Sequence, residues 1–122
     1  MLLLRTLFIS ALFFFSAQTF AADQQKIDSL KSQIDGNIAD SSRMRLLFEL
    51  SSEIGARDTL LSFSYLERGR ALAESLDNVR GLGVYHKILG KIKSRCGLYD
   101  QAILNYDRAL AFFNEADDHP SF

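Results

Sequence analysis

Apolar residues recur every three or four positions along the chain after residue 22, and this spacing predicts amphipathic helices. In the segment 24–35, the apolar positions are Ile27, Leu30 and Ile34 on a polar background. A second segment repeats the spacing at four positions, Met44, Leu47, Leu50 and Ile54. Because no segment alternates with a period of two residues, the pattern predicts an all-α fold.

Polar residues and glycines separate the first expected helices. Gly36 and Asn37 end the first helix, and Asp40 or Ser41 can cap the second, which Gly55 closes. The part 22–39 is therefore expected to hold only a short N-terminal amphipathic helix.

Capping and turn residues likewise divide the rest of the chain into three more helices. Asp58 opens a third helix, and its expected apolar positions are Leu61, Tyr65, Leu72 and Leu76. Residues 77–78 separate it from a fourth helix that runs to about Cys96. After a turn at Gly97, a fifth helix runs to about Glu115, and residues 117–120 break it. The sequence thus predicts two helix pairs, at about 40–78 and 79–118.

Small residues lie where the last two helices would touch, at Gly90, Gly97, Ala102 and Ala109. Large apolar residues lie between them, at Leu89, Ile92, Tyr99, Ile103 and Tyr106. This pattern resembles a tetratricopeptide repeat, a helix–turn–helix unit of about 34 residues. The resemblance implies antiparallel helix pairs stacked as a short α-solenoid that binds or spaces partner proteins. We expect the closest helix contact near Gly90 and Ala102, and a left-handed backbone at Gly97.

The two halves repeat each other weakly. Leu46, Leu47, Gly55 and Asp58 match Ile88, Leu89, Gly97 and Asp100 at an offset of 42 residues, and the offset is 40 after Asp58. A period of about forty resembles the longer variant of the tetratricopeptide repeat. The first copy departs from the pattern, because Phe48 stands in the Gly90 position and because Ser62 and Gly69 replace alanines. In the second copy, His86 and Lys93 stand where the family often has aromatic residues.

Residues 1–21 have the features of a secretory signal peptide. Arg5 gives a positive start, residues 6–15 are apolar, and Thr19 and Ala21 are the small residues that cleavage after residue 21 requires. An uncleaved anchor is the alternative, but the apolar run of about ten residues is shorter than the roughly 20 that a spanning helix needs. We expect export to the periplasm or another extracytoplasmic space. Contact with a membrane is expected only through an uncleaved leader or a part of the protein beyond this sequence.

Composition and single residues add little chemistry. A formal net charge of −1 argues against a nucleic-acid partner, which favours a strong basic excess. His86 and His119 have no metal ligand at the usual spacing, and His86 is expected to be a hydrogen-bonded core or boundary residue. Cys96, the one cysteine, is expected to be a small buried side chain, with an intermolecular disulfide as the alternative. No catalytic, cofactor or metal site is therefore expected, and the protein is not expected to be an enzyme.

Basic residues gather on the fourth helix. Lys87, Lys91 and Arg95 recur at four-residue spacing and share one face. The tetratricopeptide resemblance implies that the first helix of each pair lines a concave groove. The expected groove residues are Arg45, Glu49, Lys87, Lys91, Ser94 and Arg95. Such a groove could hold an acidic peptide or a C-terminal carboxylate. The alternative is a solvated face balanced by Glu67, Glu74 and Asp107.

The overall layout supports two functional hypotheses. A secretion signal, a short helix and degenerate repeats resemble the extracytoplasmic N-terminal region of certain bacterial sensor histidine kinases and diguanylate cyclases. The first hypothesis is an exported module that binds a peptide or packs on partner domains, and the alternative is the sensor fragment of such a signalling enzyme. The fifth helix offers Ile103, Tyr106, Leu110 and Phe113 at helical spacing, more than one preceding pair can cover. Further repeats or self-association through this helix are therefore expected.

Overall fold

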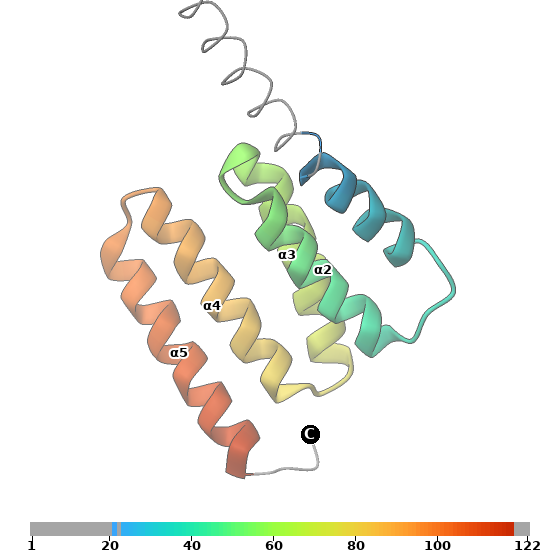
Figure 1. Ribbon diagram of the computed structural model, residues 1–122. Coiled ribbons are helices and arrows are strands. Elements are labelled where there is room, and N and C mark those ends of the chain that lie inside the picture. Colours follow the sequence, from blue (N-terminus) through green and yellow to red (C-terminus); the bar gives the residue numbers. More distant parts are fainter. Residues whose placement is uncertain (1–20, 22, 119–122) are drawn as a thin grey trace, which may run out of the picture.

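Every regular element in the described part of the chain is helical, as the apolar spacing predicted. The computed structural model describes residue 21 and residues 23–118, so the predicted signal peptide, apart from its last position, residue 22 and residues 119–122 lie outside the description (Figure 1). A helix at residues 23–34 comes first. It is followed by α2 (Asp40–Ile54), the 3-10 turn η1 (Gly55–Arg57), α3 (Thr59–Ser75), α4 (Val79–Arg95) and α5 (Tyr99–Asp118).

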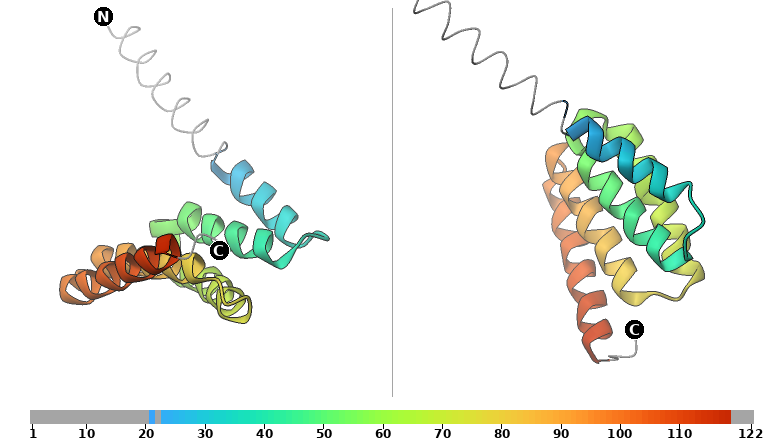
Figure 2. Two further views of the ribbon diagram at one scale, coloured as in Figure 1. Left: turned by 90° about the horizontal axis from the view of Figure 1, so that it is seen from below. Right: turned by 45° about the vertical axis from the view of Figure 1, so that its right-hand side comes forward.

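The helices form a row in which neighbours in sequence are neighbours in space. α2 packs against α3 and α4 packs against α5, and Figures 1 and 2 show the second pair lying beside the first. One core joins the two pairs and consists of Met44, Phe48, Leu66, Ala73, Tyr85, Ile88 and Ile92. A second core joins the N-terminal helix to the first pair and consists of Ile27, Leu30, Ile34, Leu46, Leu47, Leu50 and Ile54. The first pair is therefore covered on both sides.

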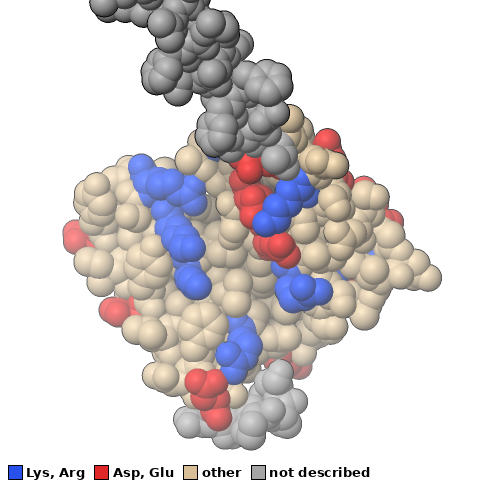
Figure 3. Space-filling model, in the orientation of Figure 1, with Lys and Arg blue, Asp and Glu red and all other residues tan. Residues whose placement is uncertain are grey.

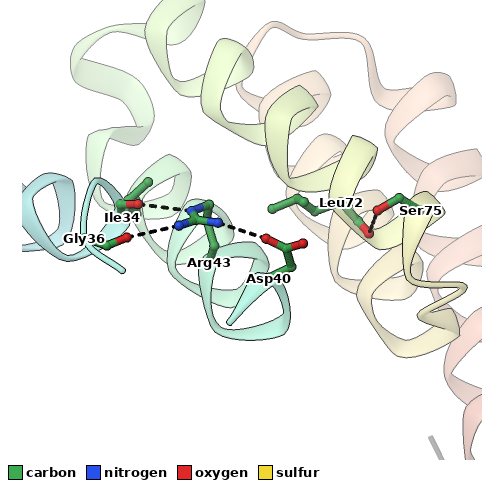
Figure 4. A network of polar contacts seen from close by, with 6 residues as sticks. All are labelled: Ile34, Gly36, Asp40, Arg43, Leu72 and Ser75. Carbon is green, nitrogen blue, oxygen red and sulfur yellow. Dashed lines mark hydrogen bonds and ion pairs between the residues drawn. The ribbon is translucent and has the colours of Figure 1, made fainter. Parts of the chain in front are cut away.

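Arg43 fastens the end of the N-terminal helix to α2 (Figure 4). Its guanidinium donates to the carbonyls of Ile34 and Gly36, both at 3.1 Å, and pairs with Asp40 at 2.9 Å. Carbonyls at a helix C-terminus lack partners within the helix, so Arg43 satisfies groups that would otherwise need water. The expectation that Asp40 or Ser41 caps α2 was wrong. Ala39 occupies the N-cap without a side-chain bond, because the Asp40 carboxylate is engaged by Arg43 instead.

Glycines allow aromatic rings to lie directly on neighbouring helices. A Cβ atom at Gly83 would lie 2.7 Å from the Phe113 ring, and one at Gly90 would lie 2.9 Å from the Tyr106 ring. The two contacts are seven residues apart on both α4 and α5, as antiparallel packing requires. The helices do approach closely at Gly90, but the expectation that this is the closest contact was wrong, because a Cβ atom at Gly83 or at Gly69 would lie nearer to an aromatic ring. The atoms nearest to Gly90 belong to the Tyr106 ring, because a ring extends farther across the contact than the methyl group of Ala102. The second contact, at Gly83, was not predicted.

The first pair also has a ring packed on a glycine, but the two helices exchange these roles. The ring belongs to α2 and the glycine to α3, since a Cβ atom at Gly69 would lie 2.6 Å from Phe48. Ser62, another departure from the repeat pattern, exchanges two hydrogen bonds with Ser51: each hydroxyl donates to the other's carbonyl, at 2.7 and 2.8 Å. Both serines are fully buried. These substitutions therefore compensate one another across the α2–α3 contact.

The turns after α3 and α4 share one hydrogen-bond pattern. Asn78 N–H donates to the Ala73 carbonyl after α3, and Leu98 N–H donates to the Lys93 carbonyl after α4, each at 2.9 Å. This Schellman arrangement needs a left-handed residue just past the helix end. Gly97 takes that position with φ of 77°, as predicted, whereas the first turn uses Asp77 with φ of 48°. The carboxylate of Asp58 caps α3, which was also predicted.

Two expectations about helix faces and ends were wrong. Leu61 and Leu76 are exposed, and the fully buried positions of α3 are Ser62, Leu66, Gly69 and Ala73. Small side chains fill this face because α3 lies close to both α2 and α4. α5 continues to Asp118, past the expected end near Glu115. Ala116 is buried in that extra turn and Asp117 pairs with Arg80 at 2.7 Å, so tertiary contacts hold it.

The ring-over-glycine contact of the first pair predicts that Gly69→Ala destabilises the protein. Alanine is the better helix former by up to about 1 kcal/mol. Crowding of the Phe48 ring should outweigh that gain, since overpacking costs about 1–3 kcal/mol. Urea unfolding of Gly69→Ala, of Phe48→Leu and of the double mutant measures the change in unfolding free energy. In a Phe48→Leu background, the Gly69→Ala change should become neutral or stabilising. If it is equally harmful in both backgrounds, the contact is not the cause.

The left-handed turn predicts an order of tolerance at Gly97. No atom lies within 4 Å of a Cβ built there, so only backbone strain opposes a side chain. Gly97→Asn should cost less than Gly97→Val, because asparagine tolerates the left-handed region and β-branched residues do not. We expect Gly97→Val to lose about 1–2 kcal/mol of unfolding free energy. Equal stability of the two variants in thermal unfolding would contradict this assignment.

Candidate binding groove

A groove runs between α2 and α4, the first helices of the two pairs. Its volume is about 490 Å³. The apolar part of its lining consists of Met44, Phe48, Gly81, Val84, Ile88 and Phe113. Charged residues from both helices border it, namely Arg45, Glu49, Arg80, Lys87 and Lys91. The groove thus combines an apolar floor with a predominantly basic border.

The residues singled out from the sequence lie in or near this groove. Arg45 and Glu49 of α2 line it opposite Lys87 and Lys91 of α4. Arg95 lines a smaller hollow of about 340 Å³, which shares Ser52, Ile88 and Lys91 with the groove and so continues it. Ser94 lines neither hollow. Arg80 and Phe113 line the groove but were not among the expected residues.

Three basic residues of α4 have no ion-pair partner among the described residues, whereas Arg80, at the start of the helix, pairs with Asp117. Lys87, Lys91 and Arg95 are exposed, and within the described residues no carboxylate lies within the 4.0 Å of an ion pair from them. Two of the acids expected to balance them, Glu67 and Glu74, instead bind Arg70 at 2.7 Å each. Figure 3 shows basic side chains in a column over α4, with acidic and basic side chains intermingled farther to the right. The part of this surface that Lys87, Lys91 and Arg95 form is therefore positive, without a carboxylate in ion-pair contact.

The packing of α4 determines which of its sides faces the groove. Tyr85, Ile88 and Ile92 face the first pair, and Gly83 and Gly90 face α5. Because a helix repeats every 3.6 residues, Lys87 and Lys91 fall on the side left open between these contacts. Glycines on the α5 side let the Phe113 ring pass close over α4 and reach the groove. A search for glycine–aromatic pairs at matching spacing could have found Phe113 from the sequence.

A polar cluster at the junction of the two pairs holds α4 in this orientation. The Tyr85 hydroxyl donates to Glu67 at 2.7 Å, and Glu67 also accepts from Arg70 at 2.7 Å. The Arg70 guanidinium lies 5.9 Å from the centre of the Tyr85 ring. Burial of the phenol, reinforced by its hydrogen bond to the Glu67 carboxylate, raises the pKa of Tyr85 to about 12. The folded protein therefore favours the protonated Tyr85 hydroxyl, which donates this hydrogen bond.

His86 is a hydrogen-bonded boundary residue, as expected. Its Nδ1 lies 3.0 Å from Oδ1 of Asn105, and its ring stacks on Phe112 with centroids 5.5 Å apart. Asn105 Nδ2 donates to the Gln101 carbonyl at 2.8 Å, which leaves Oδ1 to accept from His86. The expectation that Cys96 is buried was wrong. Cys96 is exposed because it lies in the turn after α4, where no helix covers it.

The described residues contain no group of three or more His, Cys, Asp or Glu side chains placed to hold a metal ion. Among these residues, no helix has the length and apolar character to cross a membrane. Comparisons with models of known protein families, with curated proteins and with solved structures found no match to the chain.

The raised pKa of Tyr85 predicts a loss of stability at alkaline pH. The folded-state pKa lies above the ordinary value of 10.0, so this contribution is complete below pH 10 and disappears as the pH rises through about 12. The loss should be about 2 kcal/mol at most. Urea unfolding between pH 8 and 12 measures it, and Tyr85→Phe should flatten the curve in this range. An identical pH profile for the variant would show that another group is responsible.

Proposed function

We propose that this protein is a protein-interaction module, not an enzyme, and that the α2–α4 groove binds an acidic peptide segment of a partner. The observation that carries the proposal is the unpaired row of Lys87, Lys91 and Arg95 beside an apolar floor. Charge at the border steers an acidic segment towards the groove, and burial of apolar side chains supplies affinity.

The apolar floor suggests what the bound segment contains besides acids. Met44, Phe48, Val84 and Phe113 come from three different helices and surround the same space. Because the groove is open at the surface, an extended segment could place one large apolar side chain on this floor. Its neighbouring carboxylates would then lie beside Lys87 and Lys91. The apolar contact with the floor and the attraction between the carboxylates and the lysines are each weak alone. The distance between the apolar side chain and the carboxylates of the segment would provide specificity.

We further propose that the two helix pairs are repeats of the tetratricopeptide type and that the module is exported to the periplasm. The antiparallel pairing, the left-handed Gly97 and the small residues at the α4–α5 contact support the first point. The leader pattern of residues 1–21 supports the second. Both points fit a module that recognises a partner outside the cytoplasm.

The groove proposal predicts loss of binding on charge reversal. The probe is a labelled heptapeptide of glutamates with one central phenylalanine, and fluorescence anisotropy measures its affinity. Lys87→Glu with Lys91→Glu should weaken binding at least tenfold, because two attractive charges become repulsive. Affinity should also fall with added salt. Replacing the central phenylalanine by alanine should weaken binding separately, since the apolar floor loses its contact.

A matched control is available on α4 and α5. Lys93→Glu with Arg108→Glu changes the net charge equally, but neither residue lines the groove. This variant should bind the peptide nearly as well as the original protein. Circular dichroism of both variants checks that the helices persist. If both charge reversals weaken binding equally, the attraction is a general effect of net charge and the groove is not the site.

A further inference from the structure

Four large apolar side chains are exposed at one end of the molecule. Leu60 and Leu61 belong to the first turn of α3, whereas Leu98 lies in the α4–α5 turn and Tyr99 begins α5. Their exposed fractions are 84%, 37%, 42% and 65%, in the order Leu60, Leu61, Leu98 and Tyr99. Single exposed leucines are common on protein surfaces, but several large apolar side chains at one place mark a contact site.

The two segments that carry these side chains are distant in sequence and close in space. A Cβ atom at Gly55 would lie 3.1 Å from Nη1 of Arg95, and the hollow of about 340 Å³ is lined by residues of both η1 and α4. Figures 1 and 2 show both turns at the end of the row where the N-terminal helix also begins. Residues 54–61 and 95–100 together form this surface, the η1 end.

Helix geometry directs the apolar side chains of the η1 end away from the body of the molecule. The Cα–Cβ bonds of an α-helix tilt towards its N-terminus. Because α3 and α5 both begin at the η1 end, Leu60 and Tyr99 lean outwards past the ends of their helices. The surface therefore consists of separate tips and offers no continuous face to a partner helix, whereas a fluid lipid layer conforms to such tips.

The charges near the η1 end favour an anionic surface. Arg95 is exposed and Lys93 is half-buried, and neither has an ion pair among the residues that the structure describes. Two acids, Asp58 and Asp100, lie at the N-termini of α3 and α5, where the helix dipole offsets their charge. The Asp58 carboxylate also accepts from the backbone N–H of Leu61 at 3.0 Å.

The opposite end of the molecule has the opposite character. Asp35 and Asp77 are exposed there and have no ion pair within the described part of the chain. Further acids at that end are Asp40, Glu74 and Asp117. An anionic surface therefore attracts one end of the molecule and repels the other, which determines how the molecule is oriented on it.

The chain that precedes the described residues joins the folded part at the η1 end. Asp23 pairs with Arg57 at 2.6 Å, and Lys26 pairs with Glu53 at 2.7 Å, so the start of the N-terminal helix is held beside η1. Residues 6–15 of the predicted leader are apolar. Export through this leader would thus present the η1 end to the membrane before the rest of the fold.

We propose that the η1 end binds the surface of an anionic lipid membrane. Leu60, Leu98 and Tyr99 enter the boundary between the headgroups and the acyl chains, and Lys93 and Arg95 bind headgroup phosphates. Tyrosine suits this depth, because its ring is apolar and its hydroxyl stays among the headgroups. The contact is peripheral and does not need the leader. None of these five residues lines the main α2–α4 groove, so the proposal does not depend on peptide binding.

Vesicle binding by the chain 22–122 tests this proposal. That chain is the product of the predicted cleavage, and both apolar cores lie within it. Co-sedimentation should show binding to vesicles that contain phosphatidylglycerol and much weaker binding to vesicles of phosphatidylcholine alone. Added salt should weaken the binding, because it screens the attraction. Failure to bind the anionic vesicles, or equal binding to both kinds, would overturn the proposal.

Paired substitutions test the apolar part of the contact. Leu60→Asn with Tyr99→Asn should weaken binding to anionic vesicles about tenfold or more, because two side chains lose their apolar contact. Leu76→Asn with Leu110→Asn is the matched control, since these leucines are 39% and 61% exposed but lie outside the η1 end. The control should bind as the original protein does. Equal losses in the two double variants would contradict the proposed face.

A second pair of variants tests the charged part of the contact. Arg95→Gln should weaken binding about fivefold, the effect of one basic residue near an anionic surface. Arg108→Gln removes the same charge from an exposed position on α5, outside the η1 end, and should leave binding nearly unchanged. An equal loss for both variants would show that net charge alone attracts the protein, and the proposal would then be wrong.

An introduced tryptophan reports which end of the full chain meets lipid, because the sequence contains no tryptophan. With anionic vesicles, the emission of Tyr99→Trp should shift to shorter wavelength and be quenched by brominated acyl chains. Leu76→Trp, at the opposite end, should show neither change. If neither tryptophan responds while the full chain is bound, the leader alone holds the protein and the η1 end does not bind lipid.

Light scattering distinguishes a protein that covers the η1 end from a membrane. Without lipid, the chain 22–122 should be a monomer at micromolar concentration. A dimer that Leu60→Asn with Tyr99→Asn dissociates, and that Leu76→Asn with Leu110→Asn preserves, would show that a second copy covers this surface. That result would overturn the proposal.

Discussion

Aromatic rings packed over glycines set the distances between helices in this protein, and the other features depend on those distances. In the second pair, Gly83 and Gly90 of α4 receive Phe113 and Tyr106. In the first pair, Phe48 comes from α2 and Gly69 from α3. In both pairs a ring therefore meets a glycine, but which helix supplies the ring differs between the pairs. Close packing explains this exchange, because the space between two helices accepts only a limited total volume.

The groove is a consequence of this packing. α4 is occupied by the first pair on one side and by α5 on another, so its remaining side forms the groove with α2. The basic residues fall on that side, while three acids of the neighbouring helices are engaged in other ion pairs. Glu67 and Glu74 bind Arg70, and Asp117 binds Arg80. These ion pairs engage three carboxylates but only two cations, Arg70 and Arg80. The remaining basic side chains of α4 therefore stay accessible to a partner.

The two ends of the row differ in a way that bears on assembly. The N-terminal helix covers the first pair with Ile27, Leu30 and Ile34, and Lys26 and Arg43 tie it to α2. Its outward side is polar. The α5 end exposes the apolar side chains of Ile103 and Leu110. The two ends of the row therefore differ in the polarity of the surface that they expose.

The sequence by itself determined the helices, most of their ends and the division into pairs. Apolar spacing placed the elements, and Asp58, Gly55 and Gly97 marked boundaries, because caps and left-handed turns are local properties of a few residues. It also placed Arg45, Glu49, Lys87 and Lys91 on sides of two helices that the structure brings together. Only the tertiary structure decided the buried face of α3, the exposure of Cys96, the N-cap of α2 and the entry of Phe113 into the groove. Each of these depends on a neighbour distant in sequence, and helical periodicity carries no information about which neighbour that will be.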